Sequence, residues 1–451
     1  MHLTRQRLLI IGAAVVIVGG LIGAFFLGGR KEIPPEVKLT VWGTEPEAAL
    51  RSLFEAYHKA YANVEVKYTE LPASNYEQVI VEALAAGAGP DVFMVGNRDL
   101  FQNLNKVAPA PPALFSLTRL RELFPSVVED DFARGGAVYA LPLSIDTLAL
   151  FYNRDYFDGA ALVRPPATWE EFVSDAKALR VVSGEKITRA GAALGGSSRS
   201  VEQAADIVQL LMLQNGVPLA GAGGGSAAFV SGDQSGRSAG ALNFYLQFAN
   251  PGAAAYTWHD AMPPARESFA AGKAAMLVDY RAALPEVQKK SPFLRVGLAP
   301  VPQVGAGGAT QPLGRERIRP ELTVEGLGAE RPASFARYRG FAVSKWSTWA
   351  NDWAWRFVVS ITTEPALVEA YLAASGTPPA LRSEIAKRLD DPELGTFAKQ
   401  ALAARSWQAP GDARVRAVFD GAIQNVLTGR TDPRTALSRA EAEINQLFQA
   451  R

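Results

Sequence analysis

Aromatic and polar side chains follow several predicted strands, where they could meet a small molecule. The candidates at these strand ends are Trp42, Asn97, Arg98, Asp146, Asp279 and Tyr280. In parallel α/β sheets, ligands bind beyond the carboxyl ends of the strands. Aromatic rings stack on the apolar faces of sugars, while carboxylates and amides exchange hydrogen bonds with hydroxyls. These residue types therefore predict a binding site for a sugar-like ligand.

A structural role is the alternative for each of these residues. Trp42 and Tyr280 could pack in a core, and Asp146 could cap a turn. A later set of tryptophans at helical spacing predicts core packing instead of a cofactor site: Trp346, Trp349 and Trp353.

Signals for catalysis and for metal binding are missing from the sequence. It contains no GxxxxGK[ST], HExxH or paired CxxC motif. With no cysteine, the chain has no disulfide, thiolate metal site or cysteine nucleophile. Its three histidines, His2, His58 and His259, are scattered, and a net charge of +1 offers no electrostatic case for nucleic acid. We expect a protein that is not an enzyme, without cofactor, metal or catalytic residues.

The elements that must position the candidates alternate between strand and helix. The strands are predicted at 37–42, 64–68 and 91–95, which implies a parallel sheet covered on both faces. Capping-box spacing marks three predicted helix starts, at Thr44–Glu47, Ser74–Glu77 and Thr168–Glu171. A β-like run at 138–153, interrupted near Asp146, could pass from one domain to another. A length of 451 residues favours two domains.

Further along, the pattern changes from mixed to helical. Strands are predicted at 274–280, 294–300 and 340–344, and a Gly/Pro/Arg-rich loop at 303–331. From Trp346 on, every segment has helical periodicity, with helices predicted at about 346–361, 364–374, 379–389, 392–405, 412–428 and 433–449.

The N-terminus carries an uncharged run, Leu8–Gly29, flanked by basic residues. Its 22 residues can cross a hydrocarbon core of about 30 Å, and no Ala-x-Ala cleavage site follows. Without the flanking Arg5, Arg7, Arg30 and Lys31, the 46 basic residues fall to 42 against 45 acidic ones, so 32–451 carries −3. We expect an uncleaved signal anchor with the body outside the cell membrane; a secreted or periplasmic protein after signal cleavage is the alternative.

Eight segments in order resemble the family 1 extracellular solute-binding proteins of ABC importers, the group that contains maltose- and oligosaccharide-binding proteins. They are LTVWG (39–43), AAGAGPDVFMVG (85–96), YALPLSIDTLALFYNRDYF (139–157), PPATWEEFVSDAKAL (165–179), ESFAAGKAAMLVDY (267–280), VGLAPVP (296–302), FAVSK (341–345) and TEPALVEAYLAASGTPPALRSEI (363–385). Together they span most of the chain, although no single segment is very specific.

The resemblance implies an α/β, two-lobed periplasmic-binding-protein fold (type II) with three interlobe crossovers, preceded by an N-terminal transmembrane helix. The crossovers would fall near 144–147, 279–281 and 344–347. The implied domains are an anchor and tether at 1–36, an N-lobe at 37–145 plus 282–344, and a C-lobe at 146–281 plus 345–451. Ligand would be held between the lobes by hinge closure.

The resemblance also carries ligand-binding positions over to this chain. In or next to the matching segments, these are Trp42, Glu45, Asn97, Arg98, Asp146, Asp279, Tyr280 and Gly340. Arg199 matches loosely a loop that closes over the ligand from the second lobe, and Trp258 is a further aromatic candidate before the segment at 267–280. The aromatic pair of maltodextrin binders is absent at 413–416, and the lipid-bearing cysteine is missing, so the run at 8–29 would replace it as membrane anchor. The implied partners are a small-molecule solute, expected to be a carbohydrate, and ABC permease subunits, with the protein itself a monomer.

Three alternatives stay open. The same fold could bind a non-sugar solute, either a polyamine or an anion such as glycerol phosphate, and Arg98, Arg199 and Arg281 suggest the anionic version. An anchored glycan hydrolase would need two converging carboxylates, such as Glu45 and Asp146. A sensory subunit would signal to a membrane partner instead of feeding a transporter.

Overall fold

The first sheet grows around β1 (Val37–Gly43), in which alternate side chains are buried. The computed structural model describes residues 35–304 and 333–449. In it, β1 pairs in parallel with β2 (Val64–Glu70) and β3 (Val92–Gly96), as predicted. All five residues of β3 are buried, which suits a strand covered on both faces.

The rest of this sheet is antiparallel, so the sheet as a whole is mixed. β14 (Arg339–Ser344) pairs antiparallel with β3, β4 (Val107–Ala108) and β7 (Ala140–Pro142). Its strand order is β2-β1-β3-β14-β4, with β7 also on β14. The helices of this N-lobe are α2 (Glu47–Ala60), α3 (Tyr76–Ala85), α4 (Leu100–Asn103), α5 (Leu117–Leu123), α6 (Ser126–Phe132), α13 (Trp353–Thr363), α14 (Pro365–Ser375) and α15 (Arg382–Lys387), and a small hairpin joins β5 (Ala133–Arg134) to β6 (Ala137–Val138).

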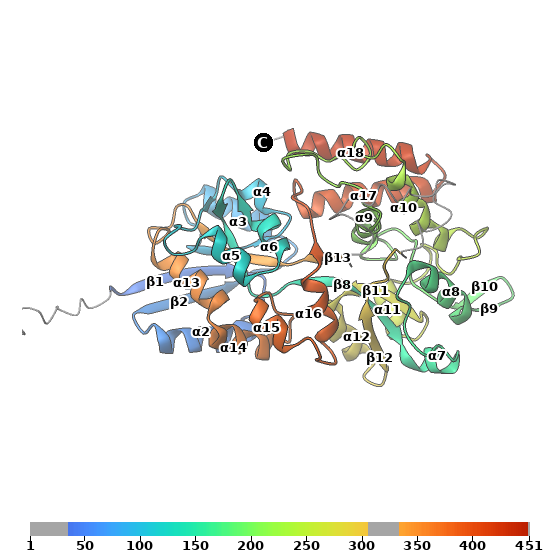
Figure 1. Ribbon diagram of the computed structural model, residues 1–451, viewed down its shortest axis with the longest axis horizontal. Helices are drawn as coiled ribbons and strands as arrows, with labels where there is room; N and C mark the ends of the chain where they lie inside the picture. Colours follow the sequence, from blue (N-terminus) through green and yellow to red (C-terminus); the bar gives the residue numbers. More distant parts are fainter. Residues whose placement is uncertain (1–34, 305–332, 450–451) are drawn as a thin grey trace, which may run out of the picture.

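The second sheet is built around β8 (Asp146–Asn153), whose central residues are fully buried. Strands β11 (Met276–Tyr280), β12 (Val296–Pro300) and β13 (Ser334–Arg337) all pair antiparallel with β8, and β15 (Ala404–Arg405) pairs parallel with β13. The remaining C-lobe elements are α7 (Arg154–Gly159), α8 (Trp169–Leu179), β9 (Val181–Ser183), β10 (Lys186–Arg189), α9 (Ala204–Gln214), α10 (Arg237–Leu246), η1 (Gln247–Ala249), α11 (Ala265–Ala270), η2 (Arg281–Ala283), α12 (Leu284–Lys290), α17 (Asp412–Leu427) and α18 (Pro433–Gln449). Figure 1 shows the two lobes side by side along the long axis.

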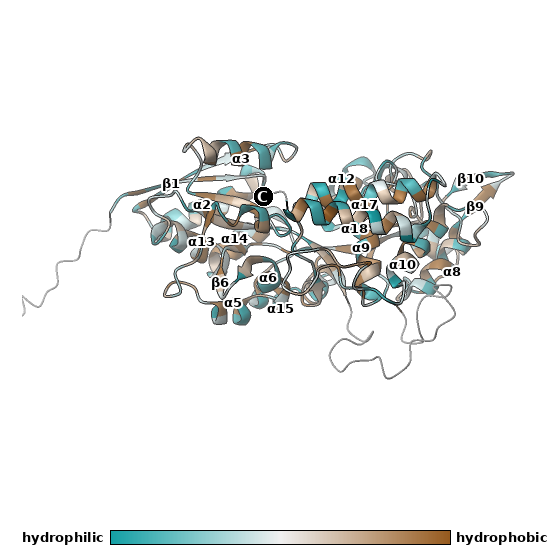
Figure 2. Cartoon of the chain, turned by 90° about the horizontal axis from the view of Figure 1, so that it is seen from above, coloured by the Kyte–Doolittle hydropathy of each residue, from teal (hydrophilic) through white to brown (hydrophobic). Residues whose placement is uncertain are grey.

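Each lobe has its own core. In the N-lobe, α13 and α14 bury Trp355, Phe357 and Tyr371 beside the strands, and in the C-lobe α17 and α18 bury Phe419 and Ile444 with β8. Helix α16 (Gly395–Ala401) touches both, because Phe397 belongs to the C-lobe core and Ala398 to that of the N-lobe. Seen from above, the helices of both lobes carry mixed hydrophilic and hydrophobic faces (Figure 2).

Only the first of the three predicted crossovers lies where it was expected. The chain leaves the N-lobe after β7 and enters β8 at Asp146. It returns at Tyr338, the single residue between β13 and β14, and crosses again between α15 and β15. The predicted crossover at 279–281 is wrong, because β11 and β12 both pair with β8. The one at 344–347 is wrong because α13 packs in the N-lobe core beside β14.

The domain boundaries change accordingly. Residues 282–300 lie in the C-lobe, not in the N-lobe as predicted, and residues 353–387 lie in the N-lobe, not in the C-lobe. An apolar strand pattern shows that a segment is a strand but not which sheet it joins, and this is why the sequence misled.

Two further expectations concern residues outside the ranges that the structure describes. The anchor at 8–29 lies outside the described residues, and so does nearly all of the loop predicted at 303–331. Within 35–304 and 333–449, no single helix is long and apolar enough to cross a membrane. Helices α13 and α14 reach that length and apolarity only together, with a 66° bend between them.

Candidate interlobe binding site

Charged side chains concentrate where the two lobes meet, and we call this region the interlobe junction. The N-lobe contributes the loop after β3, and the C-lobe contributes the first turns of α9 and α17 and the ends of β11 and β13. The junction residues are Arg98 and Asp99 of the N-lobe and Asp206, Tyr280, Arg337, Asp412 and Arg416 of the C-lobe.

Arg98 links the two lobes directly. Both of its terminal nitrogens donate to Oδ1 of Asp206 at 3.2 Å, and its guanidinium also pairs with Asp412. Its guanidinium carbon lies 4.9 Å from the ring centroid of Phe335, on β13. The side chain has no exposed surface, so these contacts replace the water that a buried cation loses.

Asp206 is the centre of a buried ion-pair cluster. Besides Arg98, it faces Arg337 at 3.4 Å and Arg416 at 3.8 Å, and it accepts a hydrogen bond of 2.9 Å from the Tyr280 hydroxyl. Burial alone would raise the pKa of Asp206, but Arg98, Arg416 and Arg337 outweigh it and hold that pKa well below its usual range. The carboxylate is therefore charged at every physiological pH.

A second group of polar side chains lies on the N-lobe side. Arg339 pairs with Glu77 at 3.3 Å and lies over the ring of Tyr76. Burial raises the pKa of Glu45, while Arg339 and a hydrogen bond from Tyr371 oppose the rise. Loss of hydration, followed by the charge of Asp99, raises the pKa of Glu77 to about 7, although 45% of its side chain is exposed. Such carboxyls can accept or donate hydrogen bonds.

Asp146 and Asp279 are occupied by structural bonds. Asp146 accepts backbone N–H bonds from Thr147, Arg281 and Ala282 at 2.8–2.9 Å, which caps η2. Asp279 is fully buried and holds Arg266 through two hydrogen bonds, of 2.5 and 2.9 Å. The contacts of Asp146 are therefore those of a residue that caps a turn, the structural alternative given for it from the sequence.

Asn97 is also fully engaged. Its side-chain amide donates to Asp131 at 3.0 Å and to Ser406 at 2.8 Å, and its Oδ1 accepts from the backbone N–H of Tyr338. The amide is 2% exposed. It joins the loop after β3 to two crossovers.

Four of the predicted site residues lie apart from the ion-pair cluster. Trp42 is partly buried against the N-lobe core, and Trp258 is buried with its Nε1 donating to Ser200. A Cβ on Gly340 would come within 2.8 Å of the Phe132 ring, so close packing explains this glycine. Arg199 is exposed, and no ion pair joins it to any described residue.

The sequence reasoning missed Asp206, Arg337, Arg339 and Asp412. Asp206 had a usable signal, because it is the one charged residue in the otherwise uncharged helix AADIVQLLMLQ. Nine consecutive residues of this helix, from Ala204 to Met212, are buried, and a buried charge needs partners. Arg337 and Arg339 flank the crossover residue Tyr338. They were missed because the crossover was predicted at 344–347 instead.

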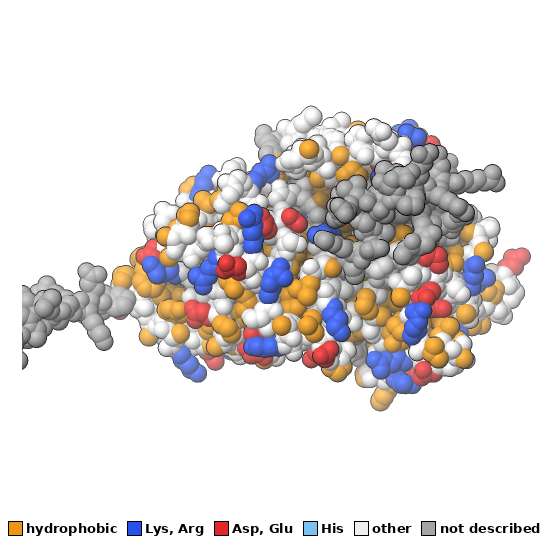
Figure 3. Space-filling model, viewed as in Figure 1, with side chains coloured by type: hydrophobic (Ala, Val, Ile, Leu, Met, Phe, Trp, Pro, Cys, Tyr) orange, Lys and Arg blue, Asp and Glu red, His pale blue; other side chains and the backbone are white. Residues whose placement is uncertain are grey.

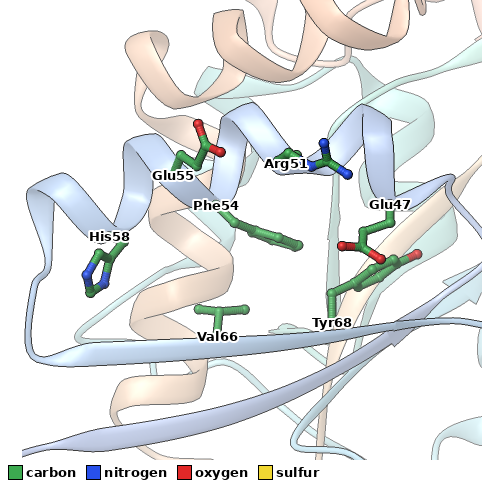
Figure 4. Close-up of a pocket in the computed structure, with 7 residues that line it drawn as sticks. All are labelled: Glu47, Arg51, Phe54, Glu55, His58, Val66 and Tyr68. Carbon is green, nitrogen blue, oxygen red and sulfur yellow. The ribbon is translucent and has the colours of Figure 1, made fainter.

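A shallow pocket opens on the outside of the N-lobe, between α2 and β2. It has a volume of about 300 Å³, with Phe54, Val66 and Tyr68 between the helix and the strand and charged residues along α2 (Figure 4). On the face drawn in Figure 3, basic and acidic side chains are interspersed instead of forming a field of one sign. Among the described residues, no group of three His, Asp or Glu side chains could hold a metal ion.

Comparison with known proteins agrees with the two-lobed architecture. The sequence model of the family described as "Bacterial extracellular solute-binding protein" matches residues 42–326. A "Putative binding protein" of Brucella abortus is 25% identical over 154 residues, which cover 33% of this chain and 37% of the relative. A protein of Brucella suis with the same description matches equally well. The chain thus aligns with little more than a third of the length of these curated relatives.

Solved structures resemble nearly the whole chain. The cyclic α-maltosyl-1,6-maltose binding protein of Arthrobacter globiformis has a TM-score of 0.72 at 18% identity, covering 93% of this chain and 100% of that one. The sugar-binding protein MalE of Xanthomonas citri has a TM-score of 0.71 at 19% identity, with 91% and 97% covered. The GacH receptor of Streptomyces glaucescens scores 0.67 at 21% identity, with 92% and 100% covered. At these identities the likeness establishes the fold.

Proposed function

Because the chain belongs to the bacterial extracellular solute-binding proteins, we propose that it binds a carbohydrate between its lobes and delivers it to an ABC importer. The family match over residues 42–326 carries the proposal, since it includes parts of both lobes and the first crossover. Ligand binding would shift the lobes toward a closed arrangement that docks on the permease.

The charges at the junction support an uncharged, hydroxyl-rich ligand. Of the three arginines that suggested an anion, Arg98 is neutralised by Asp206 and Asp412, and Arg281 lies 3.9 Å from Glu393. Arg199 has no such partner among the described residues. Glu45, Glu77 and Arg339 supply donors and acceptors for hydroxyls, and we propose them, with Trp42, as ligand contacts.

Hydrolysis has less support. A glycosidase needs two carboxyl groups free to act on the scissile bond. The two oxygens of Asp146 are taken up by three backbone N–H groups, so it is a poor partner for Glu45 in that chemistry.

The anchor and the partners complete the proposal. The uncharged run at 8–29 would hold the body on the outer side of the membrane, beside the permease. A monomer suffices for this role, because both lobes that face the ligand come from one chain.

Thermal unfolding of the full chain in detergent tests the ligand class. The panel would include maltotetraose, mannobiose and tagatose, which bind to proteins of similar fold, together with spermidine and glycerol 3-phosphate. A ligand at 100 times its Kd adds about 2.7 kcal/mol to the free energy of unfolding. For a domain of 150–250 residues, each kcal/mol shifts the midpoint by about 2–4 °C.

We expect at least one carbohydrate to raise the midpoint and the charged compounds to have no effect. A rise with spermidine or glycerol 3-phosphate, and with no sugar of a broad panel, would contradict the carbohydrate assignment. Release of a cleaved product from a sugar that binds would instead point to a hydrolase.

A further inference from the structure

Asp131, near the end of α6, is a buried carboxyl at the meeting point of two crossovers. Its side chain is fully buried. Oδ2 accepts hydrogen bonds from the Tyr338 hydroxyl at 2.7 Å and from Nδ2 of Asn97 at 3.0 Å. Oδ1 has no hydrogen-bond partner in the described part of the chain. A buried polar atom without a partner costs free energy.

The partners of Asp131 belong to the segments that join the lobes. Tyr338 is the one residue between β13 of the C-lobe sheet and β14 of the N-lobe sheet. Asn97 bonds the backbone of Tyr338 in both directions, at 3.0 and 3.2 Å, and donates to Ser406, directly after β15. Asn97 also precedes Arg98, the arginine that pairs with the C-lobe. Asp131 therefore bonds the crossover residue Tyr338 directly, and Asn97 connects it to Ser406 and to the loop that carries Arg98.

The hydrogen bonds around Tyr338 can accommodate a proton on Asp131. The phenol has a single hydrogen but two acceptors in reach, Oδ2 of Asp131 at 2.7 Å and the Val127 carbonyl at 3.2 Å. A protonated Asp131 can donate to the phenol oxygen while the phenol donates to Val127. An ionised Asp131 must take the phenol hydrogen itself and leaves a charged carboxylate with an unsatisfied Oδ1. Burial raises the pKa of Asp131 to about 7, while hydrogen bonds from Tyr338, Asn97 and Ser406 oppose the rise.

No cation offsets that charge among the described residues. On α6 itself, Asp130 is a like charge that raises the pKa of Asp131 further, and Arg405 of β15 acts on Asp130. On α5, Arg121 pairs with Glu129 at an exposed site. The Arg134 guanidinium on β5 lies over the ring of Phe101, and β7 carries no charged residue.

We propose that Asp131 is a positioning residue that couples proton uptake to the angle between the lobes. Neutral Asp131 stabilises the arrangement of the lobes seen in this structure. Ionised Asp131 favours a second arrangement, in which water or a hydrogen-bond donor reaches Oδ1. Solute affinity would then depend on the external pH through the hinge, without a titrating group on the ligand. This consequence rests on the proposed function, but the movement itself needs no ligand.

The absence of cysteine makes the movement measurable. Lys59, at the end of α2, and Lys177, on α8, are exposed and lie on different lobes. Spin labels on a Lys59→Cys/Lys177→Cys chain report the interlobe distance distribution between pH 5 and 8.5, without ligand. We expect two populations whose ratio changes around pH 7. If the carboxyl pKa differs by one unit between the two hinge arrangements, the ratio changes about tenfold.

Variants of the labelled chain decide whether Asp131 is responsible. Asp131→Asn should abolish the pH dependence. Asp130→Asn, at the exposed neighbour, should keep the dependence but move its midpoint to lower pH, because it removes a like charge. Tyr338→Phe removes a bond that favours the ionised form, so the midpoint should move to higher pH, and this variant keeps the test open if Asp131→Asn does not fold. A distribution independent of pH, or the same dependence in Asp131→Asn, would overturn the proposal. Neither result depends on whether a sugar binds.

Discussion

At the scale of single residues, the junction shows how a buried charge is balanced. Asp206 sits in a fully buried stretch of helix, yet three guanidiniums and a phenol surround it. Replacing one member of such a cluster is costly because the others lose their counter-charge while still buried. Exposed ion pairs behave differently, since water and salt compensate for the loss.

The change Asp206→Asn should therefore destabilise the protein by about 3–5 kcal/mol. Urea unfolding at pH 7 measures the difference. The matched control is Asp352→Asn, which breaks an exposed pair with Arg356 one helical turn away and should cost less than about 1 kcal/mol. Equal effects of the two changes would show that the Asp206 cluster contributes no more than a surface pair.

The raised pKa values of Asp146 and Asp131 predict how the free energy of unfolding depends on pH. Burial raises the pKa of Asp146 to about 6 and that of Asp131 to about 7. A carboxyl whose folded pKa lies above its unfolded value binds its proton more tightly when folded. Its contribution to stability is thus fully present below about pH 4 and is lost as the pH rises through 6 to 7.

Urea unfolding as a function of pH isolates this contribution. Below pH 4, acids with lowered pKa values, such as Glu171, obscure this contribution, so the comparison belongs between pH 5 and 8. In that range Asp131→Asn should flatten the decline in stability relative to the unaltered chain. A decline of equal slope in both proteins would contradict the assigned protonation.

At the scale of elements, the three capping boxes read from the sequence had different outcomes. Thr168 does cap α8, since its side-chain oxygen accepts from the backbone N–H of Glu171 at 3.2 Å. At the other two sites the helices begin after Pro46 and Asn75, and neither start has a side-chain cap bond. The spacing of residue types was the same, and the path of the chain into the helix decided the result.

Thr168→Ala should lower the free energy of unfolding by about 1 kcal/mol, through loss of the cap on α8. Thr44 provides a matched control because it is a partly buried threonine in the same motif but makes no cap bond. Thr44→Ala should be close to neutral. Denaturant midpoints of the two variants give the comparison, and equal losses would disprove a specific capping effect.

Local patterns predicted the elements well and their partners less well. The strands at 37–42, 64–68 and 91–95, and the helices α14, α17 and α18, form close to their predicted bounds, because alternation and helical periodicity are local properties. The sheet joined by β12 and the lobe joined by α13 depend on contacts far along the chain. At the tryptophan run, the helix begins only at Trp353, so Trp346 precedes it and is 51% exposed, and core packing is wrong for that residue. Trp349 and Trp353 do pack against the N-lobe core, as predicted.

For the candidate site too, the sequence predicted which residues lie near the interlobe junction better than it predicted their contacts. Arg98 and Tyr280 do meet at the interlobe junction, because loops after strands converge there. Whether a given polar group faces a ligand or the backbone depends on neighbours such as Arg281 and Ala282 at Asp146. The sequence does not contain that information in any local window.

At the scale of the whole molecule, neither lobe is one continuous stretch of chain. The C-lobe core combines Trp169 and Leu150 with Phe419, Ile444 and Phe448 from the last two helices. Phe229 and Phe419 lie with ring centroids 5.1 Å apart. A lobe assembled in this way is incomplete until its last segment is in place.

A chain that ends at Gln408, and so lacks α17 and α18, should lose the cooperative unfolding of its C-lobe. The reason is that the apolar side chains left behind would face water. Limited proteolysis should then cut rapidly within 146–304, whereas Arg430→Ala, at the exposed turn between these helices, should resist like the intact chain. A truncated protein that resists proteolysis would show that the two helices are dispensable for the core.

The discontinuous C-lobe also bears on how the protein is made. Synthesis proceeds from the N-terminus, yet residues 412–449 are required to close a core that begins at Leu148. Contacts this distant in sequence form slowly, so the C-lobe of the nascent polypeptide should stay open at least until residues 412–449 have left the ribosome. An export channel that accepts only unfolded chains could therefore transport the C-lobe while the protein is still being synthesised.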